Sequence, residues 1–371
     1  MSEMQTMRFG DGFVSNTAAG CGNQLFFDAG ARRVSRAFFR VAQGGAFDYA
    51  LMFSNVMDST YADGAMSHAN LICEAWTLHE ASIGRCARID WHGEALCPEV
   101  TVEDVRPLTF AGRTEKEVAP GEFFQSDPVR MEFRDGEFLV LEMAFSGPKV
   151  PYHEESLLPI FAWDGAAWRY DRRMPLPGRV GCRRAVRHRV GFLGDSITQG
   201  IGTELNSYAH WNALLAGMLG AEAACWNLGI GYGRASDAAS DGAWLYKAKH
   251  NDAVVVCFGV NDINQGHDAA RIKADLAEIV RRLRQAGCRV LLQTVPPFDY
   301  DEAHTRVWNE VNAYLREELK NESDGFFDAA LLLAGSAEEP QKARFGGHPD
   351  AEGCAVWARA LYPVLRGMLE A

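Results

Sequence analysis

The second half of the chain alternates short apolar runs with longer amphipathic runs, and this alternation is the strongest constraint on the fold. Runs typical of buried strands occupy 189–193, 223–228, 253–258, 288–294 and 325–328. Runs with helical spacing occupy 206–219, 236–248, 268–286, 303–320 and 351–369. Since parallel strands need long crossover connections, this order predicts a parallel sheet with helices on both faces.

The first half of the chain has a different pattern of apolar and polar residues. Its short runs are rich in β-branched and aromatic residues and are separated by turns, as at the tight-turn dipeptide Asp135-Gly136 between two strand-like runs. The pattern predicts an antiparallel, jelly-roll-like β-sandwich, with segment 69–81 left open between strand and helix. A stretch rich in Pro, Gly and Arg at 172–188 indicates a linker. We therefore expect a β-sandwich over 1–185 and an α/β domain over 186–371.

Composition narrows the possible partners and compartments. The net charge of −12 over 371 residues disfavours binding to nucleic acid or to anionic membranes, which both attract basic patches. Nine scattered cysteines form no CxxC pair, as expected of reduced thiols in a cytoplasmic protein, although a trimmed signal peptide stays possible. We expect no metal and no cofactor. Homo-oligomerisation leaves no mark in the sequence and stays open.

Polar residues gather where the predicted parallel strands end, the edge at which such sheets bind ligands. Ser196 follows the first strand, a glycine-rich turn with Gly231 follows the second, and Asn261 follows the third. His348 precedes the last helix. This is the inventory of acyl transfer: a serine nucleophile, a histidine base, and donors from a glycine-rich turn and an amide that can stabilise an oxyanion.

The segments that carry these residues resemble, in order, the four motif blocks of the SGNH hydrolases, also called the GDSL family. They read GDSI at 194–197, NLGIG at 227–231, GVND at 259–262 and HPDAEG at 348–353. The resemblance implies a flavodoxin-like α/β/α domain with Ser196 as nucleophile and His348 as base. It also implies an oxyanion hole made by the Ser196 N–H, a second-block N–H and the Asn261 side chain. The first half is similar to the β-sandwich that precedes the catalytic domain in some bacterial GDSL esterases.

Two positions depart from the family pattern. The aspartate usual three residues before the histidine is replaced by Phe345. We expect a backbone carbonyl, or an acid from elsewhere in the fold, to orient His348, with Asp350 as a helix N-cap or a displaced acid. The family's oxyanion glycine aligns with Tyr232, so the second-block donor is left open between Gly231 and Tyr232. Two further acids of these blocks, Asp195 and Asp262, are expected to support loops.

Three hypotheses about function follow. The first is a serine esterase that removes small acyl groups, in particular O-acetyl groups from carbohydrates. The second is a lipid or thioester acylhydrolase. The third is a noncatalytic carbohydrate-binding protein on a decayed hydrolase scaffold, which the retained Ser196, Asn261 and His348 disfavour.

Overall fold

The computed structural model describes residues 12–59, 61–62, 66–67 and 69–371. The chain divides into two compact units, of which the first comprises Met1–Asp58 with Asn70–Val186. The second comprises Ser59–Ala69 with Arg187–Ala371. The short segment Ser59–Ala69 therefore belongs with the α/β unit, although the sequence pattern places it within the β-rich half.

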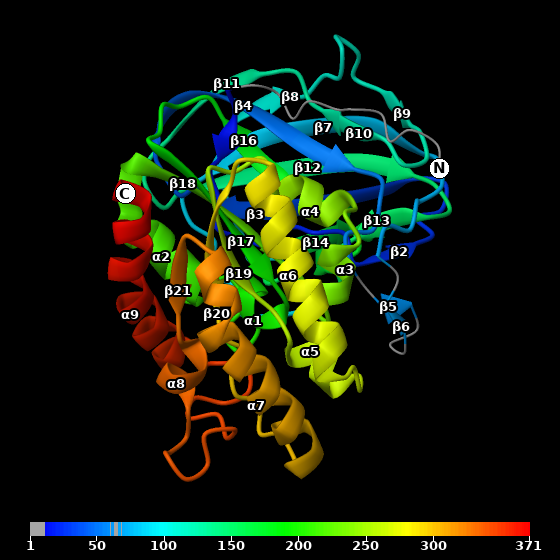
Figure 1. The fold of residues 1–371 in the computed structure, drawn as a ribbon. Helices are drawn as coiled ribbons and strands as arrows, with labels where there is room; N and C mark the ends of the chain where they lie inside the picture. The colour runs from blue at the N-terminus through cyan, green and yellow to red at the C-terminus, as the bar shows by residue number, and fades with distance from the viewer. Residues whose placement is uncertain (1–11, 60, 63–65, 68) are drawn as a thin grey trace. The chain divides into compact units, whose positions relative to one another are not determined.

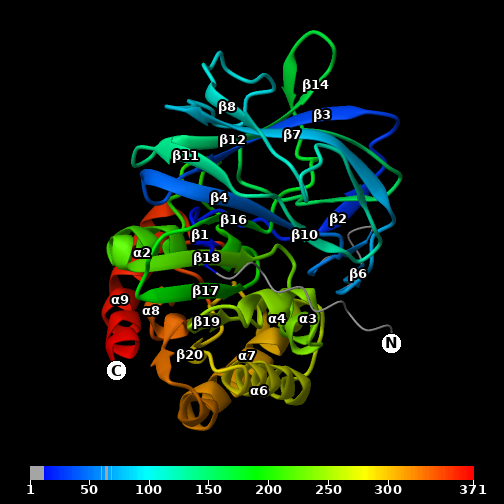
Figure 2. The ribbon, with the colours of Figure 1, turned by 90° about the horizontal axis from the view of Figure 1, so that it is seen from above.

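The first unit consists of antiparallel sheets, which Figure 2 shows as two layers. One sheet has the order β1-β16-β4-β10, with β11 also on β4. Its strands are β1 Val14–Ser15, β4 Gly45–Ser54, β10 Phe123–Gln125, β11 Val129–Phe133 and β16 Arg179–Cys182. Trp76 of the other sheet packs on Phe124 of β10 with ring centroids 6.0 Å apart, so the two layers share an aromatic core.

The other large sheet of this unit has the order β15-β14-β3-β12-β7-β8, with β9 also on β7. Its strands are β3 Arg33–Arg40, β7 Trp76–Cys86, β8 Glu103–Pro107, β9 Lys116–Val118, β12 Phe138–Ser146, β14 Ile160–Trp163 and β15 Trp168–Tyr170. A separate pair joins β2 Leu25–Phe27 to β13 Val150–Tyr152. The ambiguous segment 69–81 thus ends in a strand, β7.

The turn at Asp135-Gly136 forms, with Gly136 at a φ of 79°. It does not close a hairpin, however, because the strands on its two sides join different sheets. β11 pairs with β4, whereas β12 pairs with β3 and β7.

The second unit is built on a five-stranded parallel sheet with the order β18-β17-β19-β20-β21. Counted along the chain this is 2-1-3-4-5, the flavodoxin-like order, whose switch point lies between the first and third strands. The strands are β17 His188–Gly194, β18 Ala223–Gly229, β19 Ala253–Cys257, β20 Arg289–Gln293 and β21 Gly325–Phe327. A short antiparallel pair, β5 Tyr61–Ala62 and β6 Met66–Ser67, lies in the segment that joins this unit from the first half.

Helices cover both faces of the parallel sheet, with α2 and α9 on one face and α3, α4 and α6 on the other (Figure 1). The stacked indoles of Trp211 and Trp357, 4.9 Å apart, join α2 to α9. The helices are α1 Ser196–Gln199, α2 Trp211–Leu219, α3 Ala235–Ala239, α4 Ala243–Ala248, α5 Val260–Asn264, α6 Ala269–Gln285, α7 Glu302–Glu317, α8 Ala329–Leu333 and α9 Ala351–Glu370. Among the described residues no helix is both long and apolar enough to cross a membrane.

Two predicted helices differ from the observed ones for backbone reasons. The run 236–248 is split into α3 and α4, because Asp241 adopts a φ of 59° and interrupts the helix. The run 206–219 becomes helical only at Trp211, since Asn206 and Tyr208 both have positive φ. The loop before α2 is therefore longer than its apolar spacing indicates.

Candidate active site

Ser196 lies at the carboxyl end of the first strand of the parallel sheet. β17 ends at Gly194, and Asp195 caps the short helix α1 by accepting a hydrogen bond from Ile197 N at 3.0 Å. Gly194 is required here, because a Cβ would meet the Thr198 hydroxyl and, at 2.5 Å, the carbonyl oxygen of Cys257. The tight strand-to-helix turn therefore holds the serine side chain at the sheet edge.

His348 lies against this serine, with its Nε2 atom 2.8 Å from Ser196 Oγ. The Phe298 ring packs against the imidazole nearly perpendicularly, with centroids 5.3 Å apart. The backbone of the histidine loop also touches the loop after α1, where a Cβ on Gly202 would lie 2.6 Å from the His348 carbonyl oxygen. Burial lowers the His348 pKa, which favours the neutral imidazole that can accept a proton.

The second nitrogen of His348, Nδ1, has no hydrogen-bond partner among the described residues, so the structure differs from the expected carbonyl or distant acid. Two carbonyls of the histidine loop accept backbone hydrogen bonds within the loop: that of Ala343 from Gly346 N, and that of Phe345 from Asp350 N at 3.2 Å. The imidazole is thus positioned by packing and by its contact with the serine.

Asp350 acts at the start of α9, where its Oδ1 atom accepts a hydrogen bond from Gly353 N at 2.9 Å. The same turn explains Phe345, which stands where the family has its aspartate. The Phe345 side chain lies over Gly353, where a Cβ would come within 2.5 Å of the Phe345 Cβ atom. Both residues therefore fix the junction between the histidine loop and α9.

The backbone N–H groups of the glycine-rich turn differ in the hydrogen bonds that they already make. Gly231 N donates to the side-chain oxygen of Gln199 at 2.6 Å, which argues against Gly231 as an oxyanion donor. Gly233 N closes a turn by donating to the Ile230 carbonyl at 3.1 Å. Tyr232, between them, has a φ of 61° and a side chain 39% exposed. Of the two second-block candidates, Gly231 is therefore the one whose N–H is already engaged.

The other two donors come from neighbouring loops. Ser196 is the first residue of α1, where a backbone N–H has no intrahelical acceptor, and none exists among the described residues. Asn261 donates one amide hydrogen to the Gly233 carbonyl at 3.0 Å, which keeps its second amide hydrogen for a ligand. That bond also ties the third block to the turn that carries Tyr232.

The two remaining acids hold these loops together. Asp262, fully buried, accepts a hydrogen bond from Ala235 N at 2.9 Å and so fixes the start of α3 behind the glycine-rich turn. Asp195 is 2% exposed, and burial together with the negative charge of Asp262 raises its pKa to about 7. Burial and the same two carboxylates also raise the pKa of the Tyr300 phenol. Asp195 thus supports the nucleophile turn.

Sequence reasoning missed Phe298 and Gln199. Phe298 could have been found, because it follows the end of β20 and so reaches the same edge of the sheet as the other site residues. Gln199 carries no such signal, since only the folded structure shows that its amide oxygen accepts from Gly231 N.

A serine in contact with a histidine at this edge of a doubly wound sheet is an arrangement that serine hydrolases use. The comparison with protein families agrees, since residues 192–356 match the model of the GDSL-like lipase/acylhydrolase family. The protein is an ester hydrolase whose second unit carries a domain of this family. None of the curated proteins matches the chain.

Several solved structures match about half of the chain. The esterase EstA from Pseudoalteromonas sp. is 17% identical, with 49% of this chain and 99% of that chain covered at a TM-score of 0.40. A lipolytic protein of the G-D-S-L family from Veillonella parvula DSM 2008 is 18% identical, with coverages of 48% and 98% and a TM-score of 0.39. A mutant of Axe2, an acetyl-xylooligosaccharide esterase from Geobacillus Stearmophilus, is 18% identical, with coverages of 50% and 95% and a TM-score of 0.37.

Proposed function

We propose that the protein is a serine esterase in which Ser196 is the nucleophile and His348 the general base. The observation that carries the proposal is the 2.8 Å contact between Ser196 Oγ and His348 Nε2. His348 takes the hydroxyl proton as Oγ attacks the ester carbonyl, and returns it to the departing alcohol oxygen. Water then attacks the acyl-serine, gives a proton to His348, and releases the carboxylic acid and the free serine.

The negative oxygen of the tetrahedral intermediate is proposed to bind three donors: the backbone N–H groups of Ser196 and Tyr232 and the side-chain amide of Asn261. Tyr232 stands where the resembled family has its oxyanion glycine, and the N–H of its neighbour Gly231 already donates to Gln199. Because such donors are fixed before the reaction, each contributes about 10²–10³-fold to the rate.

Ser196 and His348 are proposed to act as a catalytic dyad, without a carboxylate partner for His348. The edge contact of Phe298 fixes the plane of the ring, and the lowered pKa keeps the imidazole neutral before the attack. Asp350 is occupied as the cap of α9 and so does not serve as the third member.

As substrate we propose small acyl esters, in particular O-acetyl groups on carbohydrates. β18 and β20 lie on opposite sides of the pair β17 and β19, so the loops that follow them approach Ser196 from opposite sides. Those loops carry the half-exposed aromatic side chains of Tyr232 and Phe298. Aromatic rings on two sides of a nucleophile suit the apolar faces of a sugar ring.

The proposal is tested with a fluorophosphonate label and a panel of esters. We expect labelling of Ser196 that disappears in Ser196→Ala but persists in Ser336→Ala, which alters an exposed serine of the same unit. Labelling that survives in Ser196→Ala contradicts the assignment. On the panel we expect p-nitrophenyl acetate and acetylated xylo- or manno-oligosaccharides to outpace p-nitrophenyl octanoate and acyl thioesters; the reverse order favours a lipid or thioester acylhydrolase.

For the first unit we propose a β-sandwich accessory domain. Its antiparallel sheets and the packing of Trp76 on Phe124 between them support this assignment. We propose domain limits of 1–185 and 186–371, one residue from the division of the chain at Val186 and Arg187, with Ser59–Ala69 in the hydrolase domain.

A further inference from the structure

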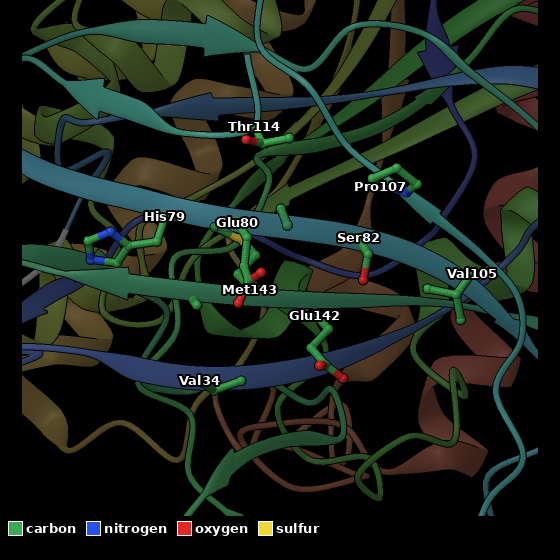
Figure 3. Close-up of a pocket in the computed structure, with 11 residues that line it drawn as sticks. Val34, His79, Glu80, Ser82, Val105, Pro107, Thr114, Glu142 and Met143 are labelled. Carbon is green, nitrogen blue, oxygen red and sulfur yellow. The ribbon is translucent and has the colours of Figure 1, made fainter. Parts of the chain in front are cut away.

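A groove of about 440 Å³ runs over one face of the seven-stranded sheet in the first unit. Figure 3 shows side chains from neighbouring strands reaching it. The strand register places them in rows: Glu142 of β12 lies opposite Ser82 of β7, and Ser82 lies opposite Pro107 of β8. Because paired residues of an antiparallel sheet point to the same side, these side chains form one continuous surface.

An aromatic surface extends this face toward the sheet edge. Phe161 of β14 lies opposite Arg36 of β3, and Arg36 lies opposite Glu142. Trp163, two residues after Phe161, therefore points to the same side as Glu142. Its indole is 43% exposed and packs on Trp168, with ring centroids 5.4 Å apart. An exposed indole fixed by a neighbouring ring is a preformed platform for an apolar face.

The two carboxylates that line the groove, Glu80 and Glu142, each have an arginine partner. Arg36 Nη2 contacts Glu142 Oε2 at 2.7 Å, and Arg32 contacts Glu80 at 2.5 Å. The groove therefore presents balanced charge, which disfavours a phosphate or a metal ion as its ligand. The guanidinium of Arg36 also lies 4.2 Å from the Trp168 ring centroid, so the polar and aromatic parts of the surface are held together.

Hydrogen-bonding groups nevertheless remain available to a neutral ligand. The hydroxyls of Ser82 and Thr114 line the groove and make no hydrogen bond within the described residues. Glu142 uses only its Oε2 atom for Arg36, which keeps Oε1 as an acceptor. Uncharged hydroxyl donors and acceptors beside an exposed indole match a polyhydroxylated ligand with an apolar ring face.

From these features we propose that the groove binds a neutral oligosaccharide, at a noncatalytic site separate from Ser196. Three strand intervals of about 4.8 Å and a two-residue offset along β14 place Trp163 roughly 16 Å from Ser82 on β7, so the ligand spans several sugar rings. The site would hold a glycan chain irrespective of its acylation.

The proposal is tested by calorimetric titration of the full chain carrying Ser196→Ala with unacetylated xylotetraose, mannotetraose and cellotetraose. We expect binding of at least one of them, weakened tenfold or more by Trp163→Ala and twofold to fivefold by Thr114→Val. Ile72→Ala, which removes another exposed apolar side chain of the first unit, should bind like its parent. The proposal is overturned if none of the three tetrasaccharides binds, or if Trp163→Ala and Thr114→Val both bind like the parent. Saturable binding of inorganic phosphate that Trp163→Ala abolishes would also overturn it.

Hydrolysis of p-nitrophenyl acetate separates this site from the catalytic one. With Ser196 intact, Trp163→Ala should retain the parent kcat/KM on this small ester while losing affinity for the oligosaccharide. If the parent did not hydrolyse p-nitrophenyl acetate, the esterase proposal would be refuted but the groove proposal would stand. A tenfold loss of this hydrolysis in a folded Trp163→Ala protein would contradict a binding site separate from Ser196.

Discussion

Replacing Asp350 by alanine tests whether this acid caps a helix or assists His348. Its Oδ1 atom accepts from Gly353 N at 2.9 Å at the start of α9, a helix of 20 residues. Loss of an N-cap side chain costs about 1 kcal/mol, which lowers the melting temperature by roughly 2–4 °C in a unit of this size. Because the imidazole keeps its contacts with Ser196 and Phe298, we expect kcat to fall less than tenfold, or by less than about 1.4 kcal/mol.

The assay combines thermal unfolding with turnover of p-nitrophenyl acetate for the parent, Asp350→Ala and Asp350→Asn. Asparagine is as good an N-cap as aspartate but carries no charge, so Asp350→Asn should recover most of the lost stability. His348→Ala supplies the reference, since removal of the base should abolish nearly all activity.

A large loss of kcat in both Asp350 variants would refute this reasoning. If the loss equalled that of His348→Ala while unfolding showed intact structure, Asp350 would be the displaced third member of a triad. Equal stability of Asp350→Ala and the parent would in turn contradict the capping role.

Three further predictions concern the same unit. Burial lowers the His348 pKa, so the acid limb of the kcat/KM profile should inflect below pH 6.5; an inflection above that value would contradict a buried, unpaired imidazole. Gly353→Ala should destabilise the protein and lower kcat, because the new methyl group would clash with Phe345. The control Gly367→Ala lies on the same helix and would meet no atom within 4 Å, so it should raise the free energy of unfolding in urea by up to about 1 kcal/mol. Since the Asp195 pKa is raised from 3.8 to about 7, its stabilising contribution is complete below pH 3.8 and lost as pH rises to 7. Between pH 4 and 8 the free energy of unfolding of the parent should therefore fall by up to about 4 kcal/mol relative to that of Asp195→Asn. If the two proteins showed the same dependence of stability on pH, the raised pKa of Asp195 would be contradicted.

The parallel sheet could be predicted because its strands are buried on both faces and read as continuous apolar runs. All five residues of β19, for example, are buried. Helix ends were less predictable where backbone conformation overrides apolar spacing, as at Asp241 with its φ of 59°. In the first half, the turn Asp135-Gly136 was visible in the sequence, but strand pairing depends on distant partners and was not.

Some parts of the candidate site could likewise be predicted from the sequence, and others could not. Ser196 and His348 could be located because parallel strands end at one edge of the sheet, and the structure brings them to 2.8 Å. The engagement of the Gly231 N–H could not be predicted, since it depends on where the Gln199 side chain lies in the folded structure. The lack of a partner for His348 Nδ1 among the described residues could not be predicted either, because the sequence does not show which groups the histidine loop brings to the imidazole.

The assignment of Ser59–Ala69 to the hydrolase unit has a consequence for how the protein is made. Ser59 Oγ donates at 2.7 Å to the buried carboxylate of Asp237, a residue 178 positions later in the chain. At translation rates of about 5–20 residues per second, Ser59 leaves the ribosome roughly 10 to 35 s before its partner exists. This segment therefore stays without its partner Asp237 until the second half of the chain is made, and a polypeptide that starts at Arg187 would lack part of its own hydrolase domain.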